Sequence, residues 1–415
     1  MTIIIDGTVG ANKAVVLDAN GKLPAIDGSL VTTLNATQVT TGSIATANID
    51  TGTTTGKVLV LDGSGAMPAI AAGAMTGVSS ATKSASDPTV STNPSTGLGT
   101  KWINTTSGEI FILTDATAGE NVWTSTGGTS GDVTPWVWQG TTYGYTSGGF
   151  GHGHYCNHIA KWSFTSDGNA TAVGTLTQGR DNCSGTSSET YGFTAGGGGP
   201  TTNIIDKFSF SSDGNAVDHG DLYTATSNTG GAGSITHGYI AGNNTSGIQK
   251  WLYATLANAT EVGNLSVNRN GSGNASGSDY GYEIGSDATP YNNVIDRFAF
   301  ASDGNAVDVG DLHTGGSFQT NNSTTHAYTD QLVNTGVVQK YALASSGNAT
   351  SLGSLMTVAR AACSPSSSTS YGYWTSGWTG SDRNIIDKMS YASEGNATDV
   401  GDIPTVQRTP CGQQV

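Results

Sequence analysis

Apolar and polar residues alternate along short stretches after Tyr143, and each stretch ends at glycine, asparagine or aspartate. The segments "IIDKFSF" (204–210) and "VIDRFAF" (294–300) both follow a two-residue period, which is typical of strands. A turn rich in Asp, Gly and Asn follows each of them, and these residues tolerate the positive φ angles of a tight hairpin. The pattern predicts an all-β, turn-rich protein, since long amphipathic helices are hard to find.

The strand, turn and strand recur in six copies. The copies are marked by an asparagine that recurs every 43 to 48 residues, always eight positions after a basic residue: Asn169, Asn215, Asn258, Asn305, Asn348 and Asn396. A strand with a glycine exit, such as "YGFTAGG" (191–197), precedes the unit, and a small-residue segment such as "RDNCSGTSS" (180–188) precedes that strand. Four short strands per repeat are typical of a propeller blade, so residues 143–415 predict six blades.

The two ends of this region predict how the ring closes. The first copy begins at its second strand with Tyr143, whereas the chain stops at "RTPCGQQV" (408–415), which aligns with "RDNCSGTS". We therefore expect the C-terminal strand to complete the first copy, which would leave no exposed sheet edge. In this alignment Cys183, Cys363 and Cys411 are equivalent, and we interpret them as small packed thiols on inner strands, not as disulfides or ligands.

The copies also alternate. Copies two, four and six carry "IIDKFSF", "VIDRFAF" and "IIDKMSY", whereas copies three and five carry "IQKWLYA" and "VQKYALA", so the true period is about 90 residues. The order of an apolar strand, a glycine doublet, the "NIIDKFSF" strand, a turn, "VGxL" and an arginine resembles the kelch repeat. The resemblance implies a kelch-like six-bladed β-propeller, but not a function, because propellers include both binding modules and enzymes.

The N-terminal part contains a different repeat. "KAVVLDANGKLPAIDGS" from Lys13 recurs as "KVLVLDGSGAMPAIAAG" from Lys57, and "GTKWINTTSGEIFILTDATAGENVWTSTGG" (99–128) is typical of a small β-module. Both segments resemble bacteriophage tail fibre proteins, in which low-charge β-repeats form thin intertwined shafts. A flexible linker is the alternative, although the recurring β-branched runs argue against simple disorder.

The resemblance implies a domain order and a set of partners. We expect a β-repeat shaft for virion attachment at 1–80, a linker and small β-module at 81–134, and the propeller at 135–415. Residues 1–130 have too few apolar positions for a core of their own, so we expect a homo-oligomer of three chains. The N-terminus would contact other virion proteins, and the protein would be located in the virion.

Charge and hydropathy exclude several classes of protein. The net charge of −15 and the lack of clustered Lys and Arg argue against nucleic acid as a partner. No window of 18 apolar residues predicts a membrane span, and "MTIIIDGTVG" lacks the pattern of a secretory signal. The sequence thus predicts synthesis in a host cytoplasm without membrane insertion.

Catalytic motifs are missing from the sequence, so we expect no enzyme activity and no cofactor. There is no G-x-S-x-G elbow, no H-E-x-x-H, no P-loop and no EF-hand spacing. The acids Asp167, Asp213, Asp303 and Glu394 recur at the hairpin turns, so we interpret them as structural and not as catalytic carboxylates or calcium ligands. A propeller-based polysaccharide depolymerase and a head or neck decoration fibre without a receptor are the alternative functions.

One segment, "GFGHGHYCNH" (149–158), places His152, His154, Cys156 and His158 at every second position. In an extended strand these side chains span about 20 Å, so a single ion could reach two of them at most. We interpret the segment as a polar binding loop, with metal binding as the alternative.

Blade geometry predicts which face binds a receptor. The chain enters at a second strand, so the face with the acidic turns should meet the shaft, and the opposite face should carry Arg180, Arg269, Arg360 and Arg408. Aromatic rings beside Arg and His suit sugars, so we expect a host-surface glycan or protein to bind the loops of that opposite face. The candidate receptor-binding residues are Phe150, His152, His154, Tyr155, Tyr291, Trp378 and Arg383.

Overall fold

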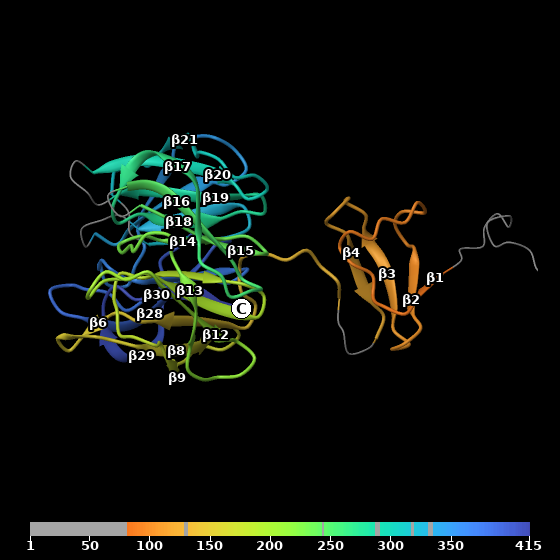
Figure 1. The fold of residues 1–415 in the computed structure, drawn as a ribbon, viewed down its shortest axis with the longest axis horizontal. Helices are drawn as coiled ribbons and strands as arrows, with labels where there is room; N and C mark the ends of the chain where they lie inside the picture. Colours follow the sequence, from red (N-terminus) through yellow and green to blue (C-terminus); the bar gives the residue numbers. More distant parts are fainter. Residues whose placement is uncertain (1–80, 128–131, 243–244, 287–290, 317–318, 331–334) are drawn as a thin grey trace, which may run out of the picture. The chain divides into compact units, whose positions relative to one another are not determined.

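A computed structural model describes residues 81–127, 132–242, 245–286, 291–316, 319–330 and 335–415 (Figure 1). The chain divides into two compact units, Met1–Thr134 and Pro135–Val415. The described residues form strands and no helix, so this part of the protein is all-β. Accordingly, it contains no helix with the length and hydropathy of a membrane span. The shaft expected at 1–80 lies outside the described residues.

The described part of the first unit, from residue 81 on, contains one four-stranded sheet, in the order β1(Thr82–Ser84), β2(Lys101–Asn104), β3(Ile110–Asp115) and β4(Val122–Ser125). β1 is parallel to β2, and the other neighbours are antiparallel. Phe111, Leu113 and Trp123 are buried on one side of this sheet, and Trp102 makes an edge contact with Trp123 at 5.9 Å between ring centroids. The expectation that residues 1–130 have no core of their own is therefore wrong for this module, because three alternating side chains bury one another within a single chain.

The described residues of the second unit form six four-stranded antiparallel sheets and one two-stranded hairpin (Figure 1). Sheet 1 consists of β30(Cys411–Gln414), β5(Tyr143–Ser147), β8(His158–Ser163) and β9(Thr171–Thr175). Sheet 2 consists of β10(Ser184–Ser187), β11(Tyr191–Ala195), β12(Ile204–Ser209) and β13(Val217–Asp221). Sheet 3 consists of β14(Gly231–Gly233), β15(His237–Ala241), β16(Thr245–Leu252) and β17(Thr260–Arg269).

The remaining sheets follow the same order of strands. Sheet 4 consists of β18(Gly273–Ser276), β19(Tyr280–Ser286), β20(Asn292–Ala299) and β21(Val307–Asp311). Sheet 5 consists of β22(Thr320–Asn322), β23(His326–Asp330), β24(Val337–Ala342) and β25(Thr350–Ser354). Sheet 6 consists of β26(Ser364–Ser367), β27(Tyr371–Thr375), β28(Arg383–Ser390) and β29(Thr398–Gln407). The hairpin is β6(Phe150–Gly151) with β7(His154–Tyr155), inserted between β5 and β8.

The two ends of the unit meet in sheet 1. The expected pairing of the C-terminal strand is confirmed, because β30 lies antiparallel to β5 with Cys411 opposite Ser147. The alignment of the three cysteines is wrong by one residue, since Ser184 and Ser364 occupy the position of Cys411 in sheets 2 and 6.

The offset arises in the link before β30. β17 and β29 are both ten residues long, and they end at the buried Arg269 and the buried Gln407 respectively. Gln407 therefore takes the position of the repeat arginine. Arg408 is one residue further on and partly exposed.

Backbone hydrogen bonds join each sheet to the next at the Asn-Ala pair of the repeat. The alanine N–H of every copy donates to a carbonyl in the fourth strand of the preceding sheet or in the residue that follows it, as in Ala216 to Thr175 (2.8 Å). At the junction of sheets 6 and 1, Ala170 donates to Asp402 in the same way. The glycine of "VGxL" makes room for this approach, because a Cβ on Gly174 would lie 1.9 Å from the carbonyl oxygen of Gly214. The Asn-Ala pair thus connects neighbouring sheets and does more than turn a hairpin.

Six hydrophobic clusters form the core, and each of them joins two consecutive sheets. Tyr145 of sheet 1 packs with Phe208 and Phe210 of sheet 2, for example. The cluster that contains Trp162 and Tyr373 joins sheet 1 to sheet 6. The first strands also contact one another in the order β30, β10, β14, β18, β22 and β26, and β26 contacts β30 again. The contacts between sheets therefore return to the first sheet.

Buried ion pairs explain the alternation between copies. The third strand of each sheet has a β-bulge at one equivalent position, such as Ile205/Asp206 in sheet 2. Because of the bulge, both residues are fully buried, and Asp206 pairs with the buried Arg180 at 3.1 Å. In sheet 3 the residue after the bulge is Gln249, whose amide accepts from the Thr224 N–H and donates to the Thr224 carbonyl. The sheets with an even number use Arg and Asp, whereas sheets 3 and 5 use Gln, which gives the period of about 90 residues.

Candidate functional site

The connections of sheets 1, 2 and 6 gather at one edge of the second unit, which we call the loop face. It comprises the loops between second and third strands, at 148–157, 196–203 and 376–382, and the links between sheets, at 176–183 and 408–410. Isolated bridges join the loops to links between sheets, namely Phe150 with Arg408, Asp181 with Gly198, and Trp378 with Ala361 in the link before sheet 6. The opposite edge, which we call the turn face, holds the turns between first and second strands and those between third and fourth strands.

Phe150 and Tyr155 lie on the β6–β7 hairpin of the loop face, and their rings make an edge contact at 5.3 Å between centroids. The guanidinium of Arg408 lies over the Phe150 ring at 4.7 Å. On the other side, the Tyr155 ring covers Gly199 of sheet 2, where a Cβ would come within 2.4 Å of its atoms. The hairpin is thus held against the loops of two other segments of chain.

Asp382 connects this group to sheet 6. Its carboxylate accepts from Nη1 of Arg408 at 2.9 Å, with the Arg408 side chain 36% exposed and that of Asp382 16% exposed. Backbone bonds align the same segments, because Gly377 donates to the Gln407 carbonyl and Phe150 donates to the Arg408 carbonyl. Asp382, Arg408 and Phe150 therefore form one continuous contact at the junction of sheets 6 and 1.

Trp378 occupies the position in sheet 6 that Phe150 occupies in sheet 1. Each follows a glycine with positive φ, Gly377 at 116° and Gly149 at 108°, and each bridges a link between sheets. Trp378 exchanges two backbone hydrogen bonds with Ala361, and its side chain is 39% exposed. The loop face therefore presents an aromatic ring on each side of the segment 407–408.

The other predicted receptor residues differ in their exposure and in the sheet to which they belong. Arg383 opens β28 and is half-buried, and its Nε donates to the Thr379 hydroxyl at 2.8 Å. His152 and His154 are exposed on the hairpin, with their rings stacked at 6.5 Å. Tyr291 is 52% exposed but belongs to sheet 4, which contacts neither sheet 1 nor sheet 6 in the core. The structure thus brings six of the seven residues to one junction and leaves Tyr291 apart.

Three of the four arginines expected at the loop face are buried inside it. Arg180, Arg269 and Arg360 pair with Asp206, Asp296 and Asp387, and none of these six side chains is exposed. Their guanidinium groups also donate to backbone carbonyls, such as Arg360 to Trp374. The expectation that they face a receptor is wrong, because a guanidinium that is removed from water needs a carboxylate partner and the bulge supplies one. Of these four arginines, only Arg408 is partly exposed at the surface.

The alternating histidines do not form a metal cluster. The segment folds back at His152 (φ 51°) into the hairpin, and Cys156 is buried beneath it. Burial also raises the pKa of the Cys156 thiol, which disfavours the thiolate that binds metals. Among the described residues no group of three His, Cys, Asp or Glu side chains could hold an ion.

The acids of the turn face pair with lysines of the preceding sheet. Asp213 pairs with Lys161, Glu394 with Lys340, and Asp167 with Lys388. A groove of about 560 Å³ opens on this face between sheets 5 and 6, lined by His326, Tyr328, Lys340, Tyr371 and Glu394 among others. Because Glu394 already bonds Lys340 and the Tyr328 hydroxyl, the charged groups of the groove satisfy one another. The pairing is consistent with the structural interpretation of the turn acids.

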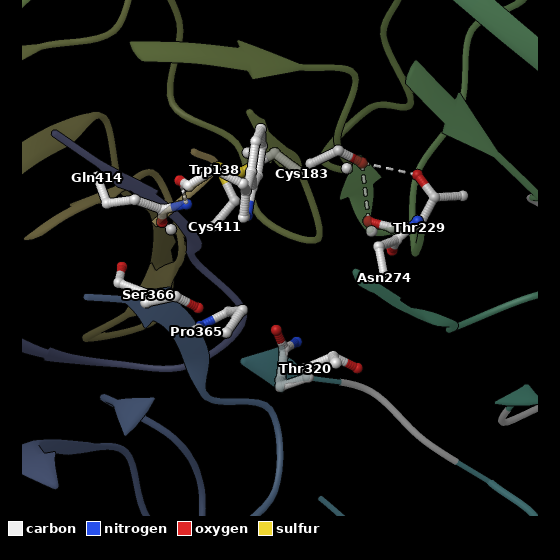
Figure 2. Close-up of a pocket in the computed structure, with 16 residues that line it drawn as sticks. Trp138, Cys183, Thr229, Asn274, Thr320, Pro365, Ser366, Cys411 and Gln414 are labelled. Carbon is white, nitrogen blue, oxygen red and sulfur yellow. Dashed lines mark hydrogen bonds between the residues drawn. The ribbon is translucent and has the colours of Figure 1, made fainter. Parts of the chain in front are cut away.

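The first strands surround a central cavity of about 60 Å³ (Figure 2). Trp138 lies over one side of it, and the Trp138 carbonyl accepts from Nε2 of Gln414. The neighbouring Gly140 donates to Ser367 at the end of β26, so the chain enters this unit along the turn face. A cavity of this size holds a few water molecules and is too small for a sugar.

Sequence reasoning missed Asp382 and the separate role of Arg408. Asp382 stands in "GSDRN" beside Arg383, and only the tertiary structure shows that it pairs with Arg408. The alignment treated Arg408 as equivalent to Arg180, Arg269 and Arg360, so it hid the difference between this partly exposed arginine and the three buried ones. No known family model and no curated protein matches the chain.

Proposed function

We propose that Pro135–Val415 is a six-bladed β-propeller with the kelch-like order of strands, in which each sheet is one blade. Two observations support this: six similar antiparallel sheets, and hydrophobic clusters that join each sheet to the next and sheet 6 to sheet 1. Radial packing of blades leaves only short, protected edges. The C-terminal strand supports the proposal further, because it covers the edge of β5.

The protein is, in this proposal, a bacteriophage tail fibre or a related virion appendage. The support lies in the sequence, whose low-charge β-repeats at 1–80 resemble tail fibre shafts. The same segment is proposed to form a homotrimer and to contact other virion proteins. A distal propeller on such a shaft would carry the receptor-binding surface.

The loop face at the junction of sheets 6 and 1 is the proposed receptor site, and a host-surface glycan is the proposed ligand. One observation carries the proposal: Trp378 is 39% exposed beside the contact between Phe150, Arg408 and Asp382. An exposed indole stacks on the C–H face of a sugar, and an Arg paired with an acid offers both donors and acceptors to hydroxyl groups. Backbone bonds on both sides hold these groups in place before a ligand binds.

A panel of immobilised bacterial surface glycans, probed with the full chain, tests this proposal. Replacing Trp378 and Arg383 together by alanine should weaken binding about thirtyfold or more, since a stacked ring and a charge-assisted bond contribute about 2–4 kcal/mol. The matched control, Asp213→Asn with Asp303→Asn, changes two acids of the turn face that pair with lysines. Loss of binding in the control, with binding kept in the Trp378 and Arg383 variant, would show that the receptor site lies on the turn face and not on the loop face.

A polysaccharide depolymerase is the second candidate, and one pair of carboxyl groups favours it. Asp181 and Asp382 contact consecutive residues, with the Thr409 hydroxyl donating to Asp181 and Arg408 donating to Asp382. Burial raises the pKa of Asp181, as a general acid requires, and Asp382 is held by its ion pair with Arg408. Release of reducing ends from a bound glycan, abolished by Asp181→Asn, would establish the enzyme. Binding without release would favour the receptor role.

A head or neck decoration fibre without a receptor is the third candidate. A low-resolution image of the particle with this chain labelled separates it from the tail fibre, because the two differ in where the chain sits.

A further inference from the structure

Two thiols face each other between the first strands of sheets 1 and 2. The Cys183 thiol donates to Sγ of Cys411 at 3.2 Å, although the two residues are separated by almost the whole second unit. Cys183 directly precedes β10, and Cys411 opens β30, the C-terminal strand. Both are free thiols and both are buried.

The backbones of β10 and β30 approach closely enough for a covalent link. A Cβ on Gly185 would lie 2.1 Å from the Gly412 carbonyl oxygen, so glycine at this position allows the two strands to lie side by side. A disulfide has an S–S length of about 2.05 Å, so the two sulfurs need to approach by roughly 1 Å. The neighbouring cavity, lined by both cysteines, gives the side chains room for that movement (Figure 2).

The other two cysteines have no such partner. Cys363 packs with Trp374 and Met389 between sheets 5 and 6, and its thiol donates to the Ala361 carbonyl. Cys156 lies under the β6–β7 hairpin, where its thiol donates to the His154 carbonyl. The one-residue offset of β30 matters here, because it places the Cys411 thiol at the position that serine occupies in sheets 2 and 6, opposite Cys183.

We propose that Cys183 and Cys411 are a disulfide-forming pair, which covalently fastens the C-terminal strand of sheet 1 to sheet 2. The proposal is independent of the receptor function. Its oxidant is a low-molecular-weight disulfide such as oxidised glutathione. One protein thiolate attacks a glutathione sulfur and releases one glutathione thiolate, and the second protein thiolate attacks the resulting mixed disulfide and releases the other. Both protein protons pass to the released glutathione, so two protein thiols are oxidised as one glutathione disulfide is reduced.

The bond would close a covalent loop from residue 183 to residue 411. Cross-links that enclose long loops restrict the unfolded chain strongly, which favours the folded state. The bond would also prevent β30 from separating from the unit, and that strand is the only part of sheet 1 that comes from the C-terminal end.

The test equilibrates the full chain with a mixture of oxidised and reduced glutathione at pH 8.5. Alkaline buffer is needed because the hydrogen bond to Cys411, together with burial, raises the pKa of the Cys183 thiol. Free thiols are then alkylated, and tryptic peptides are analysed by mass spectrometry. We expect peptide 181–207 joined to peptide 409–415, with Cys156 and Cys363 alkylated. We also expect the Tm to rise by about 5–10 °C and to return when dithiothreitol is added.

Two variants complete the experiment. Cys363→Ser should keep both the joined peptide and the rise in Tm, whereas Cys411→Ser should lose both. The proposal is overturned if Cys183 and Cys411 stay fully alkylated after the chain has been unfolded and refolded in the same glutathione mixture. It is also overturned if the joined peptide forms but lowers the Tm, since the native strands would then be strained by the bond.

Discussion

The guanidinium of Arg360 lies 2.6 Å from the carboxylate of Asp387, and neither side chain is exposed to solvent. Arg360 comes from the link before sheet 6, and Asp387 follows the bulge in its third strand. The Thr357 N–H donates to the same carboxylate, and the Arg360 guanidinium also donates to the carbonyls of Trp374 and Ser376. The pair therefore fixes the link between two sheets to the strand that it crosses.

Removing one partner of this pair should be strongly destabilising. Asp387→Ala leaves the Arg360 charge buried without a counter-ion, and we expect the free energy of unfolding to fall by about 3–5 kcal/mol. Urea unfolding followed by tryptophan fluorescence measures the change. Asp167→Ala is the matched control, because that acid is largely exposed in its pair with Lys388, and its loss should cost less than about 1 kcal/mol. Equal losses in the two variants would contradict the structural role of the buried pair.

The C-terminal strand should be required for cooperative folding of the second unit. Deleting residues 406–415 removes β30, exposes the edge of β5 and opens the cluster of contacts with β10 and β26. We expect a broad, low-temperature transition in calorimetry in place of a single sharp one. An unchanged melting transition would show that the strand is dispensable.

Substitution of a single glycine tests the packing of β30 without removing the strand. A Cβ on Gly412 would lie 1.6 Å from the Pro365 carbonyl oxygen, so Gly412→Ala should force β30 and β26 apart and cost about 1–3 kcal/mol. Gly214→Ala is the matched control, because no atom lies within 4 Å of a Cβ at that position. Thermal melts of the two variants side by side provide the comparison, and a smaller effect at Gly412 than at Gly214 would argue against tight packing there.

Arg408 should matter for binding more than for stability. Arg408→Gln removes the cation over the Phe150 ring and the bond to Asp382, so binding to the glycan panel should weaken about tenfold. Because the side chain is 36% exposed, we expect the free energy of unfolding to change by less than about 1 kcal/mol. Arg360→Gln should instead strongly lower the free energy of unfolding and have little direct effect on binding. A variant of Arg408 that unfolds as readily as the Arg360 variant would refute the distinction between them.

Glu283 should make stability depend on pH. Burial raises its pKa to about 8, from the usual value near 4.5, although Ser272 and Asn274 both donate to the carboxylate. The folded protein therefore holds a proton that the unfolded chain releases above about pH 4.5, so stability should fall as the pH rises from about 4.5 to about 8. Glu283→Gln removes this loss and should stabilise the protein at pH 8, by an amount that shrinks toward pH 5. Urea unfolding across that range measures it, and a pH-independent difference would contradict the burial of an acid.

The two units should differ in their state of association. If residues 1–80 form a trimeric shaft, the full chain should sediment as a trimer, whereas the fragment 135–415 should sediment as a folded monomer. The fragment has six clusters of its own and completes sheet 1 with its own C-terminal strand. If the fragment were a trimer, the trimer contacts would lie in the second unit. If the full chain were a monomer, the proposed shaft would be contradicted.

The repeat, the strands and the pairing of the two ends could be predicted from the order of residues. Local patterns were sufficient for these, because a two-residue period and a tight turn depend on neighbouring residues. The missing first strand of copy one and the extra strand at the end predicted β30 beside β5 without any knowledge of packing. The turn acids could likewise be interpreted from their constant position in the repeat.

The roles of the repeated polar residues became visible from their contacts in the folded chain. Asp206 and Ile205 are adjacent, and an ideal strand would turn them to opposite sides, but the bulge in β12 buries both between sheets. The partner of Asp206 is Arg180, which a sequence pattern placed at the surface. The difference between the partly exposed Arg408 and the three buried arginines depended on a one-residue offset that an alignment of similar letters concealed. Burial and register arise from contacts between segments far apart in the chain, so no local pattern of residues could determine them.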